Sequence, residues 1–148
     1  MSAPDGIGPL ASIVLANQAV TKRVFARARQ PDFNFAEWEE VRAAYAPGFR
    51  RIAANRDSRD FDEDIRLKHI FAQTYDLTIE VRRIAQAGRT VYVDAIETII
   101  GPGGFTVNTL GVITFDADDK ILSTTTYQQW APDQAPRHLA QDSAAPGK

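Results

Sequence analysis

The stretch RTVYVDAIETIIG, residues 89–101, alternates in the manner of a β-strand and carries two acidic residues, Asp94 and Glu97. Successive side chains of a strand point to opposite faces of a sheet, so the two carboxylates cannot share a face. The face of Asp94 also holds Tyr92, Ile96 and Thr98, and the face of Glu97 holds Val91, Val93, Ala95 and Ile99. At most one of the two acids can therefore look into a pocket on a given side of the sheet.

Three further runs share this texture of β-branched and aromatic residues. They are DLTIEVRRIAQAG (residues 76–88), FTVNTLGVITFD (residues 105–116) and KILSTTTYQQW (residues 120–130). The segments between the four runs are short and rich in glycine or aspartate, which is typical of hairpin turns. The second half of the chain is therefore expected to form an antiparallel sheet.

Apolar side chains in the first half of the chain recur at helical spacing. This pattern predicts helices over residues 9–29, 35–46 and about 61–74, with a short strand, FRRIAAN, at residues 49–55. Helices followed by an antiparallel sheet indicate an α+β fold. We expect residues 9–130 to form a single domain, with a flexible N-terminus at residues 1–8 and a flexible, Pro- and Ala-rich tail at residues 131–148.

The composition excludes several classes of function. The chain has 148 residues, 17 of them basic and 19 acidic, and a net charge of −2, which gives no electrostatic case for nucleic acid or for an anionic membrane. It has no cysteine and only two histidines, so cysteine chemistry and the common zinc sites are not expected. No apolar run approaches the roughly 20 residues of a membrane span. We expect a cytoplasmic protein without a metal or another cofactor.

The segment IIGPGGFTVNTLGVITFDADDKILSTTTYQQW, residues 99–130, resembles the last two strands of limonene-1,2-epoxide hydrolases, polyketide cyclases and ketosteroid isomerases. With the order of the elements over residues 9–130, the chain resembles the nuclear transport factor 2-like superfamily. The resemblance implies a cone-shaped, curved antiparallel sheet wrapped by about three N-terminal helices around a pocket. It is weaker for activity, because one fold hosts many functions.

The catalytic residues of these families are not matched in this sequence. In a gapless match through IIGP, the arginine of the epoxide hydrolases falls on Asp94, and its aspartate partner falls on Ile96. The second aspartate of those enzymes falls on Thr126, the base of the isomerases near Ala53, and their oxyanion-hole aspartate near Gly111. None of these positions keeps the required side chain, so no known mechanism transfers directly.

The same match predicts which residues line the pocket. It places Asp94 on the concave face together with neighbours on three strands: Ile96, Thr98, Val107, Thr109, Thr124, Thr126 and Gln128. Arg51, on the first strand, and Ile70, on the third helix, are further candidates for substrate binding. If the strand of Asp94 slides by one residue, every side chain changes face and Glu97 enters the pocket instead.

These residues suggest a small cofactor-independent enzyme that performs acid/base chemistry on an apolar, oxygenated small molecule. Isomerisation, cyclisation and epoxide hydrolysis are the reactions in question. Asp94 is the candidate acid/base, because a carboxylate in a partly apolar cavity has a raised pKa. Tyr92 and Thr126 are the candidate catalytic partners. The alternative is a non-catalytic small-molecule-binding or dimerisation module, which the missing family acids support.

The sheet is also expected to have a face that the helices leave open. In this interpretation the apolar side chains of residues 91–99 that point away from Asp94 remain for a partner. A second copy of the chain is the most common solution for such a face, so we expect a homodimer.

Overall fold

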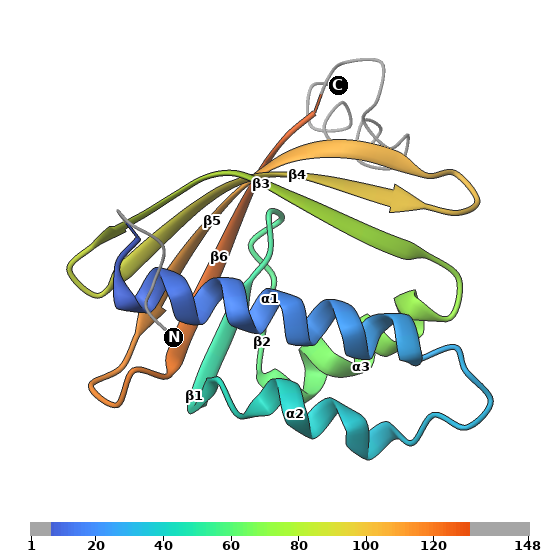
Figure 1. The fold of residues 1–148 in the computed structure, drawn as a ribbon. Helices are drawn as coiled ribbons and strands as arrows, with labels where there is room; N and C mark the ends of the chain where they lie inside the picture. The colour runs from blue at the N-terminus through green and yellow to red at the C-terminus, as the bar shows by residue number, and fades with distance from the viewer. Residues whose placement is uncertain (1–6, 131–148) are drawn as a thin grey trace.

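The computed structural model describes residues 7–130, which form three α-helices, a 3-10 helix and a single sheet (Figure 1). The helices are α1 (Pro9–Arg27), the 3-10 helix η1 (Phe35–Trp38), α2 (Glu39–Arg42) and α3 (Phe61–Ala72). The strands are β1 (Tyr45–Ile52), β2 (Ser58–Arg59), β3 (Asp76–Ala87), β4 (Thr90–Ile100), β5 (Phe105–Phe115) and β6 (Ile121–Gln129).

The six strands form one sheet in the order β2-β1-β6-β5-β4-β3. All neighbouring strands are antiparallel except β1 and β6, which run parallel. Figure 1 shows the sheet curving over the helices, with α1 lying across its inner side. This arrangement confirms the predicted α+β fold with a curved sheet and N-terminal helices.

The region before the sheet differs from the prediction. The second helix, expected to reach residue 46, ends at Arg42, and β1 already begins at Tyr45. The dipeptide Pro47-Gly48 lies inside β1, where the pairing with β6 shifts register, and a proline can occupy an irregular strand position that needs no N–H donor. Strand β2 has only two residues, too few to show any periodicity in the sequence.

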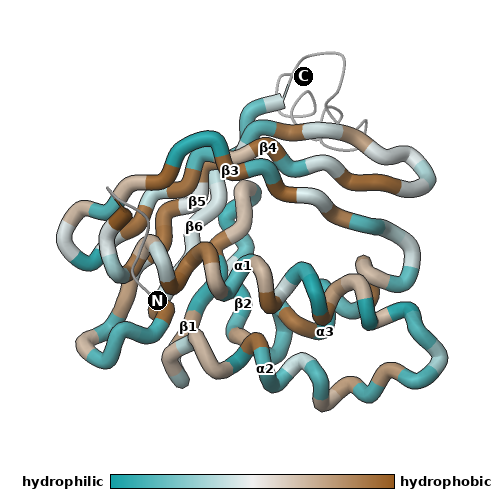
Figure 2. The backbone as a smooth tube through the Cα atoms, viewed as in Figure 1, coloured by the Kyte–Doolittle hydropathy of each residue, from teal (hydrophilic) through white to brown (hydrophobic). Residues whose placement is uncertain are grey.

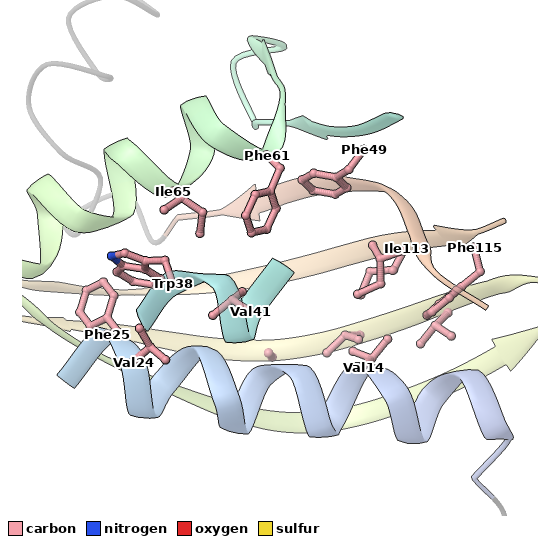
Figure 3. Packing of buried hydrophobic residues seen from close by; sticks show 14 of the residues in the cluster. Val14, Val24, Phe25, Trp38, Val41, Phe49, Phe61, Ile65, Ile113 and Phe115 are labelled. Carbon is pink, nitrogen blue, oxygen red and sulfur yellow. The ribbon is translucent and has the colours of Figure 1, made fainter. Parts of the chain in front are cut away.

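The core lies between the helices and the inner face of the sheet. Figure 3 shows side chains from all three helices and from β5 pointing toward one another around this space. Trp38, which is 1% exposed, packs within this cluster of buried residues, as do Val24 and Phe25 of α1 and Ile65 of α3. Hydrophobic residues recur along the strands, whereas the segment that joins α1 to α2 is mainly hydrophilic (Figure 2).

One expectation about the sheet is wrong. The apolar side chains of β4 that were expected to meet a second copy of the chain, among them Val91, Val93 and Ala95, are buried in this chain's own core. The packing of α1 on the more apolar face of β4 removes that face from water within one molecule. The face left open is the opposite one, which carries Tyr92, Asp94 and Ile96.

The ends of the chain are described only in part. Of the N-terminal segment 1–8 the structure describes Ile7 and Gly8, and the predicted flexible tail at 131–148 lies outside the described residues. Within residues 7–130, no helix is both long and apolar enough to cross a membrane.

Candidate functional site

A cavity of about 760 Å³ lies between α1, α3 and the inner face of the sheet. Most of its wall is apolar, with side chains from α1, α3 and β3 to β6. The apolar part includes Val14, Phe25, Leu67, Phe71, Leu77, Ile79, Val93, Ala95 and Ile113. A mainly apolar concave site with a few converging polar groups is the usual description of a small-molecule pocket.

The structure places Glu97 in this cavity and Asp94 outside it. Asp94 lies on the outer face of the sheet, where its Oδ2 accepts a hydrogen bond from Nε of Arg83 at 2.9 Å. The predicted orientation of β4 is therefore wrong, and the alternative with Glu97 inside describes the molecule.

The turn between β4 and β5 explains this outcome. Ile99 pairs with Phe105 across the turn, so odd residues of β4 stand opposite odd residues of β5. Glu97 is thus opposite Val107, whereas Asp94 is opposite Leu110. The predicted set mixed the two faces, because it combined even residues of β4 with odd residues of β5.

The other predicted site residues divide in the same way. Five of them line the cavity: Arg51, Thr109, Thr124, Thr126 and Gln128. Three follow Asp94 to the outer face of the sheet: Tyr92, Ile96 and Thr98. Val107 is buried on the inner face beside Glu97, but it does not line the cavity. The side chain of Ile70 does not line it either, because that residue of α3 is 66% exposed.

Glu97 lies in this cavity without a direct partner among the described residues, since no hydrogen bond or ion pair holds its carboxylate. Burial raises the pKa of Glu97 above the ordinary value of 4.5, and the nearby charges of Arg51 and Lys68 offset part of that rise. The carboxyl group of Glu97 therefore binds a proton more tightly than that of an exposed glutamate.

A cluster of charged side chains stands near Glu97, centred on Asp64 of α3. Asp64 is only 4% exposed and accepts hydrogen bonds from three cations. Nε of Arg51 lies 2.8 Å from Oδ2, a guanidinium nitrogen of Arg59 lies 3.4 Å from Oδ1, and the ammonium of Lys68 also contacts Oδ2. Burial opposes ionisation of Asp64, but Lys68 and Arg51 together lower its pKa to about 2.

The cations of this cluster repel one another as well as attracting Asp64. Burial, reinforced by the charge of Arg51, lowers the pKa of Lys68 to about 8, although Asp64 acts in the opposite direction. Arg51 and Arg59 pair directly across β1 and β2, so two like charges face each other on neighbouring strands. The buried carboxylate of Asp64 offsets this repulsion.

Tyr45 and Asn17 add a hydroxyl and an amide to the polar part of the cavity. The hydroxyl of Tyr45 accepts a hydrogen bond from Nδ2 of Asn17 at 2.9 Å, and both residues line the cavity. Burial raises the pKa of Tyr45, so this hydroxyl keeps its proton and can donate it to an oxygen in the cavity.

Two signals in the sequence could have identified the missed residues. Asp64 and Lys68 are four positions apart in FDEDIRLKHIFA, the spacing that brings two side chains together on one helix face. For β4, the more apolar of its two faces is the one that packs on helices. That rule selects the face of Val91, Val93 and Ala95, and Glu97 with it.

No group of three or more acidic or histidine side chains within residues 7–130 is arranged to hold a metal ion. No protein-family model matches the chain, and no curated protein matches it in sequence. Many solved structures resemble it.

An NTF2-like protein from Burkholderia thailandensis is 16% identical, with a TM-score of 0.62 over 83% of this chain and 92% of that one. An NTF2-like protein of unknown function from Cytophaga hutchinsonii is 14% identical, with a TM-score of 0.60 over 93% and 99% of the two chains. An LEH-like epoxide hydrolase from M. tuberculosis is 17% identical, with a TM-score of 0.54 over 75% and 84%. Structures bearing the SnoaL-like polyketide cyclase name also match.

The chain therefore has the nuclear transport factor 2-like fold, as the resemblance of residues 99–130 predicted. At identities below a fifth, these likenesses establish the fold and leave the chemistry to the side chains of the cavity.

Proposed function

We propose that this protein is a small cofactor-independent enzyme that moves a proton on an apolar, oxygenated small molecule, with Glu97 as the acid/base. The observation that carries the proposal is the position of Glu97, a carboxylate without a direct partner among the described residues, in a mainly apolar cavity. This role belonged to Asp94 in the sequence-based hypothesis and passes to Glu97 with the corrected orientation of β4.

The proposed step is proton transfer at a carbon next to a carbonyl group. In a β,γ-unsaturated ketone, the Glu97 carboxylate takes the proton from the α-carbon, the electron pair of the C–H bond forms a double bond to the carbonyl carbon, and the π pair of the carbonyl moves onto its oxygen. Protonated Glu97 then returns the proton to the γ-carbon of this dienolate while the carbonyl re-forms, which completes the isomerisation. A base with a raised pKa suits this task, because a general base works best when its pKa lies near the working pH.

The cations beside Glu97 support the developing negative charge. Lys68 and Arg51 lie close enough to Glu97 to influence its pKa, and both line the cavity. Fixed positive charges near an enolate or alkoxide oxygen stabilise the transition state more than the neutral substrate. Three polar side chains of β6 are available to orient the substrate: Thr124, Thr126 and Gln128.

A non-catalytic binding module is the second candidate, and one observation favours it. Ala53, Gly111 and Thr126 all line the cavity, and none of these positions carries the carboxyl group that the resembling families use there. In that case the cavity would hold its ligand unchanged.

The test is deuterium exchange in D2O, followed by NMR, with 2-tetralone and a β,γ-unsaturated ketone as probes. We expect wild type to catalyse exchange, and Glu97→Gln to lose about 10²- to 10⁴-fold of the rate, the usual contribution of a positioned base. Asp94→Asn is the matched control on the outer face of the same strand and is expected to retain the wild-type rate. The rate should rise with pH across a range above the ordinary titration of a glutamate, since burial raises the pKa of Glu97.

An equal exchange rate in wild type and Glu97→Gln would contradict the proposal. An absence of exchange, combined with tight binding of the ketones, would favour the binding module instead.

A further inference from the structure

The cavity has an excess of positive charge, although the chain as a whole is negative. Four basic and two acidic side chains line it: Lys22, Arg51, Arg59, Lys68, Asp64 and Glu97. The net charge of the chain is −2. The cavity is thus net positive within a chain that is net negative.

Three of the four basic side chains surround a single carboxylate, that of Asp64. Asp64 is the shared acceptor of Arg51, Arg59 and Lys68, so a single negative charge serves three positive ones. Charges with little access to water are costly unless they are paired, and the three cations, with 19–26% of their side chains exposed, outnumber the one carboxylate that contacts them. Glu97 forms no ion pair with any of them among the described residues, and its raised pKa reduces the compensation it offers.

Unsatisfied polar atoms occur in the same place. Within the described residues, two buried side-chain atoms have no hydrogen-bond partner, Oγ1 of Thr21 and Nε of Arg59, and both residues line the cavity. Arg59 is otherwise held to Asp64 by one contact of 3.4 Å, so its guanidinium retains most of its donor capacity. Buried groups without a partner are rare in folded proteins and require a specific explanation.

From this juxtaposition we infer that the ligand of the cavity carries a carboxylate on a mainly apolar body, and that Arg59 binds this carboxylate, which leaves Arg51 and Lys68 beside Glu97. An arginine guanidinium matches a carboxylate in two parallel hydrogen bonds, and an anion here supplies the charge that Asp64 alone cannot. The apolar walls then receive the rest of the molecule. The inference deepens the proposed function and rests on it for the reaction, but the binding of the anion does not require Glu97 to react.

Arg59 can be altered without removing the two closer partners of Asp64. Its removal leaves Asp64 paired with Arg51 at 2.8 Å and with Lys68. Arg83 offers a matched control, because it also pairs with one aspartate, Asp94, but on the outer face with 85% of its side chain exposed.

The experiment measures the binding of 2-naphthoate and of the neutral 2-naphthamide by calorimetry at pH 7. We expect wild type to bind the carboxylate at least about tenfold more tightly than the amide, as charge-assisted hydrogen bonds predict. Arg59→Gln should lose most of this preference and bind the amide as wild type does. Arg83→Gln should keep the preference unchanged.

Equal affinities for the two probes, or no measurable binding of the carboxylate, would overturn the inference. A preference that survives intact in Arg59→Gln would also overturn the assignment to this cluster. These failures are distinct from that of the proposed function, which depends on the exchange rate of Glu97→Gln with the neutral ketones.

Discussion

Asp64 is the residue on which the charged side of the cavity depends. Its side chain is 5% exposed and is the common acceptor of three cations, and its pKa is held at about 2. Because the folded-state pKa lies below the ordinary value of 3.8, ionised Asp64 stabilises the folded state above that value, and this contribution is lost as the pH falls toward 2. The same carboxylate keeps Arg51 and Lys68 next to Glu97.

Substitution of Asp64 by asparagine should therefore destabilise the protein at neutral pH. We expect Asp64→Asn to lower the free energy of unfolding by about 3–5 kcal/mol, because it leaves buried cations without their anion. The loss of stability between about pH 4 and pH 2 should be smaller in the variant than in wild type. Urea unfolding at several pH values measures both effects.

Asp62, on the same helix, is the control, because its side chain is 65% exposed and it pairs with Arg42 at the surface. Asp62→Asn should change the free energy of unfolding by no more than about 1 kcal/mol. Equal effects of the two substitutions would show that Asp64 does not hold the cluster together.

At the same scale, β4 shows what the sequence determines and what it does not. Alternation establishes that Asp94 and Glu97 lie on opposite faces, but not which face is inside. That choice depends on the number of residues in the turn between Ile99 and Phe105 and on the packing of α1, neither of which follows from the strand alone. Five of the predicted residues line the cavity because they lie on the inward faces of β1, β5 and β6.

At the scale of elements, α1 depends on a contact with the sheet at its first turn. The residue before the helix, Gly8, has no side chain to cap it. Instead, Oε1 of Gln86 on β3 accepts hydrogen bonds from the backbone N–H of Leu10 at 2.9 Å and of Ala11 at 3.2 Å. Gln86 therefore satisfies two of the free donors of the helix and fastens α1 over the cavity.

We expect Gln86→Ala to lower the free energy of unfolding by about 1–2 kcal/mol, the usual cost of a lost helix cap. Gln86→Glu keeps the acceptor oxygen and places a negative charge at the helix N-terminus, where it is favourable, so this variant should remain close to wild type. Chemical denaturation of the two variants measures the difference. Equal losses would mean that the contact contributes packing rather than capping.

The elements themselves differ in how far the sequence predicts them. The long strands and α1 have enough residues for their periodicity to be clear. The segment before β1 does not, because η1 and α2 have four residues each and β1 pairs with β6, which is more than seventy residues away at Tyr45 and Ile121. Long-range pairing overrides the local helical pattern there.

At the scale of the whole molecule, the outer face of the sheet remains open to solvent. Tyr92, Leu110 and Tyr127 on this face are 41%, 40% and 46% exposed. Leu110 stands directly opposite Tyr127 on one side and Asp94 on the other, so an exposed leucine and tyrosine lie next to the Asp94–Arg83 ion pair on this face. The expected homodimer stays a prediction, and it belongs to this face rather than to the buried one.

Sedimentation equilibrium should therefore give the mass of a dimer for wild type. Leu110→Glu places a charge at the centre of the outer face and should shift the protein to monomer. Ile70→Glu is the control, because Ile70 is exposed on α3, on the helical side of the molecule. A monomeric wild type, or a Leu110→Glu variant that remains dimeric, would contradict this prediction.

The measurement that tests the central claim most directly is the NMR titration of the Glu97 side-chain carboxyl carbon, assigned with the Glu97→Gln variant. The account predicts a pKa above the ordinary 4.5, because burial in the cavity disfavours the charged form more than Arg51 and Lys68 favour it. Removal of the positive charge in Lys68→Met should raise the pKa further. A Glu97 pKa at or below the ordinary value, unchanged in Lys68→Met, would contradict a cavity base under the influence of these cations and remove the support for acid/base catalysis.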